Sequence, residues 1–302
     1  MKVWIVRAGD GATVGDILRR AREDLSAIAA GWVFVGKKRV TSATQAVRIG
    51  DEVRIGKPGP KEAPAEVLWT CAGLVACVKP AGIPTVPDHA GAAHALVARV
   101  SKALGVRGEA LRVTSRLDRE VSGVVIFAQT EEAEARLKAA RAEGRYERRY
   151  VAIAKGELPA ESGTWDAPIG RAPNPLLRAV NGIDAKESET RWRVVARTHA
   201  FLLLAVAPIT GRTHQIRVHS AYAGVPLLGD RDYGGPTRAT LASGSVVSLS
   251  RIVLHAARVA VPDGTGAVLE AIAPIPEDLR RPWAELGGEP EAWDTAVACA
   301  LA

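Results

Sequence analysis

The sequence predicts an α+β fold: a mixed, largely antiparallel sheet with flanking helices, preceded by a small α+β domain. Two observations support this prediction. Segments with strand character outnumber those with helical spacing, and the two kinds do not follow the regular alternation of a parallel α/β protein. Residues 56–66 are rich in proline and glycine, which is typical of a linker between two domains. With 302 residues, of which 47% are hydrophobic, the chain can bury a substantial core.

The first domain is expected over residues 1–57. Apolar spacing predicts a helix over residues 13–30, with Thr13 as its N-cap and Asp16 three residues later, close to a capping box. A strand, a tight turn and the start of a second strand follow, and a last strand closes the domain; these are expected over residues 32–40 and 47–55.

The first domain is also the basic part of the chain. It has 11 lysines and arginines against 6 aspartates and glutamates, and so carries +5 of the net charge of +7. Such a module suits binding to a polyanion, although charge that only improves solubility would look the same.

A linker over residues 58–66 is expected to lead into a second domain over residues 67–285, and residues 286–302 are expected to form a loosely attached tail. In the second domain, periodicity predicts strands over residues 74–78, 121–128, 150–154, 191–196, 201–207 and 253–261, and helices over residues 92–104, 131–143 and 213–223.

Composition and spacing exclude several classes of protein. The three cysteines, Cys71, Cys77 and Cys299, have neither disulfide-scaffold nor metal-ligand spacing. The chain has no apolar run of membrane-spanning length and no recognisable leader, so we expect a soluble cytoplasmic protein with no membrane partner. It also lacks a Walker-type loop and a dinucleotide fingerprint.

Two segments concentrate charge next to apolar strands. Residues 114–123 contain Arg116-Leu117-Asp118 and lead into an apolar strand. Residues 211–219 contain two arginines and two histidines and directly follow a second apolar strand. An arginine and an aspartate in such settings are costly to desolvate unless they pair with each other or with a ligand. Asp118 could therefore be a nucleophile or a base, or belong to a surface turn with an incidental salt bridge. His214 and His219 are five residues apart, a poor spacing for two metal ligands on one helix.

Taken together, these segments resemble the signature motifs of RluA-type RNA pseudouridine synthases. The match includes residues 116–118 with 122–123, then 211–219, 229–230 and 233–234, and in addition 75–82, 149–152 and 254–256. The first domain resembles the small basic RNA-binding module first recognised in a ribosomal small-subunit protein. The resemblance covers roughly residues 5–275, and residues 211–219 are its most specific part.

The resemblance implies roles for individual residues. Asp118 would be the catalytic aspartate, Tyr150 the aromatic residue that stacks on the target base, and Arg217 the ion-pair partner of Asp118. Ile216 would be an apolar wall of the pocket, and Arg116 would hold the target nucleotide out of its stack. Further substrate-binding residues are expected at Arg212, Lys37, Lys38 and Arg39, with phosphate contacts from Arg145, Arg148 and Arg149.

The implied reaction is the isomerisation of uridine to pseudouridine, which needs no cofactor and no metal, and we expect neither. The expected partner is RNA, with large-subunit ribosomal RNA as the first expectation and transfer RNA as the alternative, bound by a monomer. Two other classes stay open. One is an RNA-binding or ribosome-assembly factor without catalysis. The other is a glycoside hydrolase, which would need a second carboxylate such as Glu120 or Asp230.

Some residues call for a plainer interpretation, and two depart from the family pattern. Ser115 and Val121 stand where the family usually has histidine and threonine, which places the rate and the target in question more than the reaction. Lys79 is expected to be a solvated lysine at a strand end. His255 lies in an apolar run and is expected to be a structural histidine, and His214 and His219 to belong to the scaffold.

Overall fold

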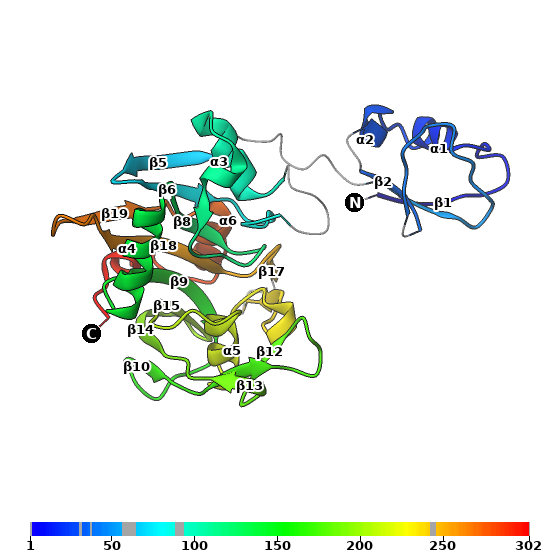
Figure 1. Cartoon of the computed structure of the whole chain (residues 1–302). Helices are drawn as coiled ribbons and strands as arrows, with labels where there is room; N and C mark the ends of the chain where they lie inside the picture. Colours follow the sequence, from blue (N-terminus) through cyan, green and yellow to red (C-terminus); the bar gives the residue numbers. More distant parts are fainter. Residues whose placement is uncertain are drawn as a thin grey trace. The chain divides into compact units, whose positions relative to one another are not determined.

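The computed structural model describes residues 2–29, 32–36, 38–55, 65–87, 94–241 and 246–301. It divides the chain into two compact units, Met1–Ala63 and Pro64–Ala302, each with its own core (Figure 1). Within the described ranges, no helix has both the length and the apolar character needed to cross a membrane.

The first unit is a four-stranded antiparallel sheet, in the order β1-β4-β2-β3, packed against two short helices. Its core is made by apolar side chains of the first helix and of β2 and β4, including Ile17, Val33 and Val53. The elements are β1 (Lys2–Ile5), α1 (Val14–Arg20), α2 (Ser26–Ala29), β2 (Val33–Val35), β3 (Lys38–Arg39) and β4 (Glu52–Ile55).

The helix expected over residues 13–30 is wrong as one continuous element, although its start is confirmed. Thr13 caps α1, and its side chain and that of Asp16 form the full capping box. The chain then leaves the helix at Arg22, which has a φ of 56°. Asp24 accepts a hydrogen bond from the backbone N of Ser26 at 2.7 Å and so starts α2. A local side-chain bond to the backbone thus competes with continuation of the helix.

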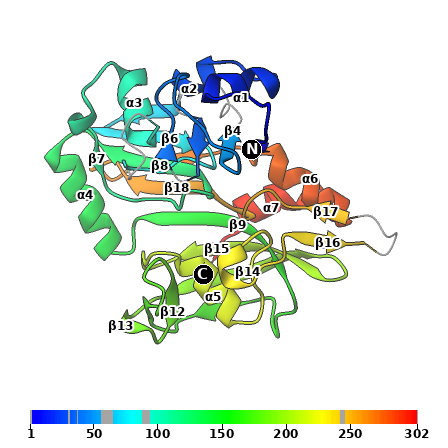
Figure 2. The same ribbon diagram turned by 90° about the vertical axis from the view of Figure 1, so that its right-hand side faces the viewer.

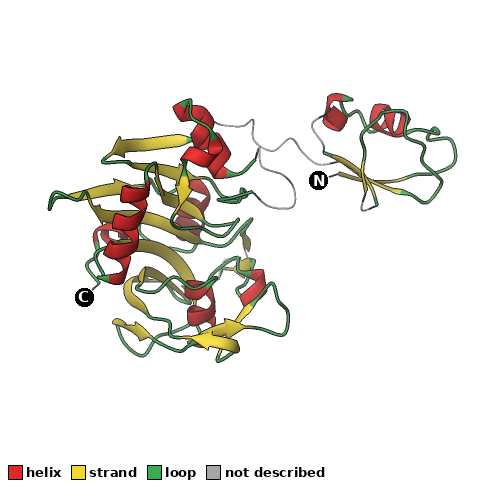
Figure 3. Cartoon of the chain, in the orientation of Figure 1, coloured by secondary structure: helices red, strands yellow, loops and turns green. Residues whose placement is uncertain are grey.

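The second unit is built on a ten-stranded sheet. Eight strands follow the order β10-β14-β15-β9-β18-β8-β6-β5, with β19 beside β18 and β7 beside β8. The pairing of β8 with β18 is parallel, and the other described pairings in this sheet are antiparallel, which confirms the predicted α+β class. Strands fill the middle of the unit and helices flank them (Figure 3).

The strands of the large sheet are β5 (Glu66–Cys71), β6 (Leu74–Lys79), β7 (Arg112–Val113), β8 (Ser122–Ala128), β9 (Glu147–Lys155), β10 (Ser162–Trp165), β14 (Thr190–Arg197), β15 (Phe201–Pro208), β18 (Leu254–Pro262) and β19 (Val268–Ile272). Two small sheets hold β11 (Ile169–Arg171), β12 (Arg178–Val180) and β13 (Ile183–Lys186), and β16 (Arg238–Thr240) with β17 (Val246–Ser248). Residues 58–64 of the predicted linker lie outside the described residues, and Glu66 already belongs to β5.

Helices cover both faces of the sheet, because successive strand residues point to opposite sides. On β6 and β8, one set of side chains packs against α3 (Leu96–Leu104) and the alternate set against α4 (Glu131–Ala142). On β9 and β15, one set packs against α5 (Gln215–Tyr222), and the other against α6 (Glu277–Glu285) and α7 (Ala292–Ala298). Helix α5 also lies beside β12 (Figure 2). Two short 3₁₀ turns complete the unit, η1 (Gly108–Ala110) and η2 (Arg231–Tyr233).

The prediction of a loose tail over residues 286–302 is wrong. Trp293 and Ala296 of α7 are fully buried in the cluster that also holds Trp283 of α6. The two tryptophan rings meet edge to face with their centroids 6.5 Å apart. Two large apolar side chains at one end of the chain therefore give this segment enough burial to dock on the sheet.

A glycine permits the close parallel pairing of β8 with β18, directly after the loop that carries Asp118. Gly123 in β8 has a φ of 121°, and a Cβ there would lie 2.2 Å from the carbonyl oxygen of Ala256 in β18. Any other residue would push β8 away from β18. The Ser122-Gly123 pair therefore fixes how closely the residues 116–120 approach the middle of the sheet.

Candidate active site

A cavity of about 1080 Å³ lies where loops from distant parts of the second unit meet. Its walls come from residues 84–87, 113–121 and 208–217, together with side chains of β9 and β18. The two charged segments that the sequence singled out therefore face the same space. Asp118, Tyr150, Arg116, Arg212, Ile216 and Arg217 all line it.

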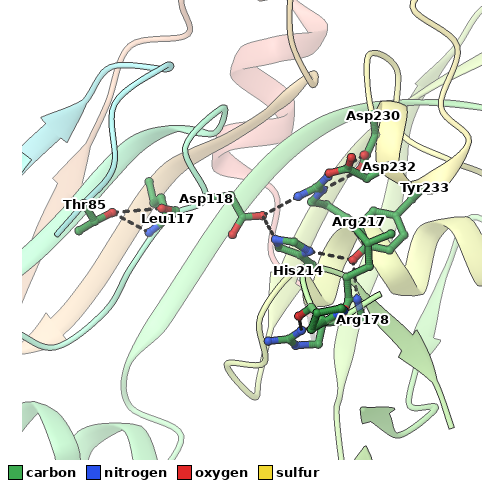
Figure 4. A network of polar contacts seen from close by, with 11 residues as sticks. Thr85, Leu117, Asp118, Arg178, His214, Arg217, Asp230, Asp232 and Tyr233 are labelled. Carbon is green, nitrogen blue, oxygen red and sulfur yellow. Dashed lines mark hydrogen bonds and ion pairs between the residues drawn. The ribbon is translucent and has the colours of Figure 1, made fainter. Parts of the chain in front are cut away.

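Arg217 on α5 binds three carboxylates at once (Figure 4). Its Nε and Nη2 donate to the two oxygens of Asp230 at 2.7 and 2.8 Å, Nη2 also donates to Asp232 at 2.7 Å, and Nη1 donates to Asp118 at 3.2 Å. The predicted contact between Arg217 and Asp118 is thus present. Burial alone would lower the pKa of Arg217, but the hydrogen bonds and charges of Asp230 and Asp118 raise it.

The backbone on both sides of Asp118 is held by buried side chains. The hydroxyl of Thr85 accepts from the backbone N of Leu117 and donates to its carbonyl, both at 3.1 Å. Lys79 donates from Nζ to the carbonyl of Arg119 at 3.0 Å, and further to two carbonyls of its own turn. Asp118 is therefore presented on a rigid loop.

The expectation that Lys79 is solvated is wrong. Its side chain is fully buried at the end of β6, where burial lowers the pKa of the ammonium group to about 7. The three carbonyl acceptors explain why a lysine can be buried here, since each satisfies one donor. Lys79 ties the turn after β6 to the loop of Asp118.

Tyr150 reaches the cavity from β9, and the alternation of that strand separates the neighbouring arginines. Tyr150 and Arg148 line the cavity, whereas Arg149 points to the opposite face and donates to the carbonyl of Cys299. The expected phosphate contact of Arg149 is therefore wrong. Arg145 pairs with Glu143 on the surface. Burial raises the pKa of Tyr150 to about 12, so its hydroxyl stays protonated at neutral pH.

His214 lies at the site, and assigning it to the scaffold was wrong. Its Nε2 is 3.8 Å from Oδ2 of Asp118, and its Nδ1 is 2.7 Å from the hydroxyl of Tyr233. His219, by contrast, has the expected structural place, because its two ring nitrogens lie 2.9 Å from Thr190 Oγ1 and from the carbonyl of Ala167. The sequence could not separate the two histidines, since both belong to one motif.

Comparisons with known proteins point to one family. Residues 73–222 match a family model described as RNA pseudouridylate synthase. An uncharacterized RNA pseudouridine synthase of Bacillus subtilis is 30% identical over 297 residues, which cover 93% of this chain and 95% of that one. The chain belongs to the RNA pseudouridylate synthase family.

Two other relatives and a solved structure extend the comparison. Ribosomal large subunit pseudouridine synthase C of Escherichia coli is 30% identical over 276 residues, 83% of each chain. Synthase D of Xanthomonas campestris is 34% identical over 236 residues, 74% of this chain and 69% of that one. Human RNA pseudouridylate synthase domain containing 4 shares the fold, with a TM-score of 0.59 and 21% identity over 74% of this chain and 93% of that chain.

The chain is thus an RNA pseudouridine synthase, an enzyme that isomerises uridine in RNA. This result leaves the glycoside hydrolase alternative without support. Asp230, its candidate second carboxylate, has no exposed side-chain surface and is bound on both oxygens by Arg217. The described residues contain no cluster of histidine, cysteine and carboxylate side chains that could hold a metal ion.

The remaining residues expected at the substrate lie in different places in this synthase. Arg116 is exposed at the cavity, and Arg212 donates from Nε to the carbonyl of Glu187 at 3.0 Å. Lys38 and Arg39 are exposed on β3 of the first unit, and Lys37 lies outside the described residues.

Three features near the site carried no role in the sequence-based prediction: Thr85, Asp232 and Tyr233. Tyr233 belongs to a motif that the resemblance included and Asp232 directly precedes it, so their position was a usable signal; Thr85 had none. Of the two departures from the family pattern, Ser115 lies 3.5 Å from the hydroxyl of Tyr146, and Val121 is buried in the core beside the cavity. His255 is a buried structural histidine, as predicted, 2.8 Å from Ser122 Oγ.

Proposed function

We propose that this synthase converts specific uridines of large-subunit ribosomal RNA to pseudouridine, with Asp118 as the catalytic carboxylate. One observation carries the assignment of Asp118. Of the three carboxylates that Arg217 binds, Asp118 is the one whose side chain faces the cavity, and 28% of it is exposed. The ribosomal target is supported by the names of synthases C and D among the relatives.

The reaction breaks the bond between ring nitrogen N1 and sugar carbon C1′, turns the ring, joins C5 to C1′ and moves the proton from C5 to N1. An ionised carboxylate suits attack on C1′, addition to the ring, or abstraction of a proton from the sugar. Each of these routes uses Asp118 as an anion, and Nη1 of Arg217 donates to that carboxylate at 3.2 Å.

Tyr150 and Ile216 are proposed to hold the detached base. Both line the cavity close to Asp118, and Tyr150 offers a flat aromatic face on which a pyrimidine can stack. Stacking resists escape of the base while allowing it to rotate in its plane. A tyrosine with a raised pKa also keeps its proton, so that its hydroxyl can donate a hydrogen bond to a ring carbonyl.

The RNA itself is proposed to bind through basic residues at the cavity mouth and on the first unit. Extracting a uridine from its stack costs a few kcal/mol. Arg116 and Arg212 line the cavity where the backbone of an extruded nucleotide would pass. Lys38 and Arg39 offer further phosphate contacts, which are strong and sequence-independent.

Asp118→Asn tests the catalytic assignment. The variant keeps the volume of the side chain and one oxygen, so we expect RNA binding to persist while pseudouridine formation falls by about four orders of magnitude or more. Product is measured on total cellular RNA by mass spectrometry, and binding by filter retention. The exposed Asp294→Asn of α7 is the matched control and is expected to keep full activity. Retained activity in Asp118→Asn would exclude the assignment, and a wild type inactive on every cellular RNA would favour the non-catalytic binding factor.

The target is tested by mapping pseudouridines in RNA from cells with and without the gene. We expect one or more sites of large-subunit ribosomal RNA to lose the modification and to regain it when the wild-type gene, but not Asp118→Asn, is restored. Loss at transfer RNA sites alone would replace the ribosomal target with the transfer RNA alternative.

A further inference from the structure

A line of polar contacts runs from β12 to Asp118 (Figure 4). The backbone N of Arg178 donates to the hydroxyl of Tyr233 at 3.0 Å. That hydroxyl lies 2.7 Å from Nδ1 of His214, whose Nε2 lies 3.8 Å from Oδ2 of Asp118. Two side chains, those of Tyr233 and His214, therefore connect a small sheet to the proposed catalytic carboxylate.

The hydrogen-bond roles along this line can be worked out. The backbone N–H of Arg178 can only donate, so the hydroxyl of Tyr233 must accept from it and has its own proton free to donate. Nδ1 of His214 is the described acceptor nearest in line, at 2.7 Å. At the other end of the ring, Nε2 faces a carboxylate oxygen, which can only accept while it is ionised. Both ends of His214 thus favour the same tautomer, with the proton on Nε2.

The backbone of His214 is held in an unusual conformation that aims the ring at Asp118. The residue has a φ of 59° and a ψ of 17°, the left-handed region, and stands directly before α5. Such a conformation costs a non-glycine residue free energy, and it persists only where the surroundings impose it. The residue that follows, Gln215, is fixed by its buried amide, which bonds to Thr210, to the backbone N of Arg212 and to the carbonyl of Glu189.

The charges around His214 oppose one another. Burial is the largest influence and lowers the pKa of His214, and the positive charges of Arg217 and Arg178 act in the same direction. Asp118 and Asp232 act in the opposite direction. Tyr233 also faces the ring, which it meets edge to face with centroids 5.7 Å apart. Burial outweighs the two carboxylates, so the imidazole is neutral at neutral pH.

We propose that His214 is a positioning residue that presents a neutral Nε2–H group to Asp118, and that Tyr233 fixes this tautomer. This inference rests on the proposed role of Asp118. Arg217 approaches Asp118 from one side with a full positive charge, and its Nη1 lies 3.2 Å from Oδ2. His214 adds an oriented N–H dipole without a second full positive charge, which would draw electron density from the carboxylate and weaken it as a nucleophile or base.

Nitrogen NMR of the histidine-labelled full chain tests the tautomer without RNA or catalysis. We expect the His214 ring, assigned by its loss in His214→Gln, to show protonated Nε2 and unprotonated Nδ1 at pH 7.5. Tyr233→Phe keeps the ring over Arg217 but removes the hydroxyl, so the tautomers should mix and the pKa of His214 should rise. Tyr222→Phe, at an exposed tyrosine of α5, is the matched control and should change neither property. A proton on Nδ1, or on both nitrogens, in the wild type would overturn the proposal, whatever Asp118→Asn does to activity.

The pH profile of single-turnover activity tests the functional half. We expect His214→Gln to lower kcat by about 10- to 100-fold with little change in KM, a usual loss for an orienting partner. The wild type should lose activity as pH falls through the pKa of His214 measured by NMR, and His214→Gln should lack that limb. His199→Gln, at an exposed histidine, should keep the wild-type profile. An identical acid limb in His214→Gln would overturn the proposal, and so would a fall in activity confined to KM.

Discussion

Two buried arginines of the catalytic unit, Arg217 and Arg251, make the same fork to an aspartate but serve different ends. Both side chains are about nine-tenths buried. Arg217 grips Asp230 and Arg251 grips Asp278, each through Nε and Nη2 at 2.7 and 2.8 Å. What differs is the kind of acceptor that each guanidinium group binds beyond this aspartate.

Beyond Asp230, Arg217 donates from Nη2 to the side chain of Asp232 and from Nη1 to that of Asp118, and of these two Asp118 lines the cavity. Arg251 instead directs Nη1 to the backbone carbonyls of Glu120 and Ile252, both at 3.4 Å. Both arginines therefore hold the loop of residues 116–120. Arg217 links Asp118 of this loop to α5, and Arg251 links the end of the loop, at Glu120, to α6. A buried arginine–aspartate fork is by itself a structural device, and a further carboxylate that lines the cavity distinguishes the fork of Arg217.

The variant Arg217→Lys gives the strongest test of this difference between the two arginines. Lysine keeps the charge but cannot hold three carboxylates at fixed angles. We expect activity to fall by about 100-fold or more, equivalent to about 2.7 kcal/mol in the barrier. The free energy of unfolding should fall by about 3 kcal/mol, as for other buried pairs that lose a partner. Single-turnover kinetics and urea unfolding measure the two effects. Near-normal activity would remove Arg217 from the catalytic group.

A change of similar size in the free energy of unfolding is expected with pH, because of the buried His255. Burial lowers the pKa of His255 to about 4 in the folded protein, against about 6.5 in the unfolded chain. Between these values the unfolded chain binds more protons, so the free energy of unfolding is full above pH 6.5 and falls as pH drops toward 4. The slope should be about 1.4 kcal/mol per pH unit.

His255→Asn removes the titrating group and should flatten that slope in urea unfolding measured from pH 7 to pH 4.5. The exposed His199→Gln is the matched control and should keep it. An unchanged slope in His255→Asn would assign the acid sensitivity to other groups.

Thr85→Val should lower the free energy of unfolding by about 2 kcal/mol, because it leaves the backbone N and carbonyl of Leu117 without their partner. Activity should fall as well, since the backbone of Leu117 positions Asp118. Thr85→Ser keeps the hydroxyl and should restore most of both properties. If Val and Ser variants behave alike, the hydroxyl has no part in holding the loop.

Arg251→Lys is the counterpart of Arg217→Lys. It should lower the free energy of unfolding by only about 1 kcal/mol, because Asp278 stays half exposed and solvated. The turnover per folded molecule should stay at the wild-type level, since Arg251 meets only backbone atoms of the loop. A fall in turnover as large as that of Arg217→Lys would erase the distinction between the two arginines.

The smallest effect is expected from changes outside both regions. Lys38→Gln with Arg39→Gln should weaken RNA binding modestly and reduce the slope of log affinity against log salt by about 2, if both side chains contact phosphate. Binding measured from 50 to 300 mM salt gives the slope. An unchanged slope would argue that the charge of the first unit serves solubility.

Much of the fold and the centre of the site could be predicted from the sequence. Strand and helix periods follow from which face of an element is buried, and that is written in neighbouring residues. The capping box at Thr13 is local for the same reason. The pairing of Asp118 with Arg217 could also be predicted, because two charged groups in apolar surroundings need a partner and the motifs named which one.

The errors share a different character. The roles predicted for Lys79, Arg149 and His214 from their neighbours in sequence are wrong, because each side chain has a partner far away in the chain. These partners are Arg119, Cys299 and Asp118, respectively. The docking of α7 likewise depends on β9 and β15, strands that lie far earlier in the chain.

The sequence by itself thus determined the α+β class, the family motifs and the identity of the proposed catalytic pair. The tertiary structure decided which carboxylates share Arg217, which of them stays open to the cavity, and which histidine faces Asp118. The reason is physical: periodicity reports whether a side chain is buried, whereas the partner that makes burial of a charge tolerable is chosen by the packing of segments that are distant in the chain.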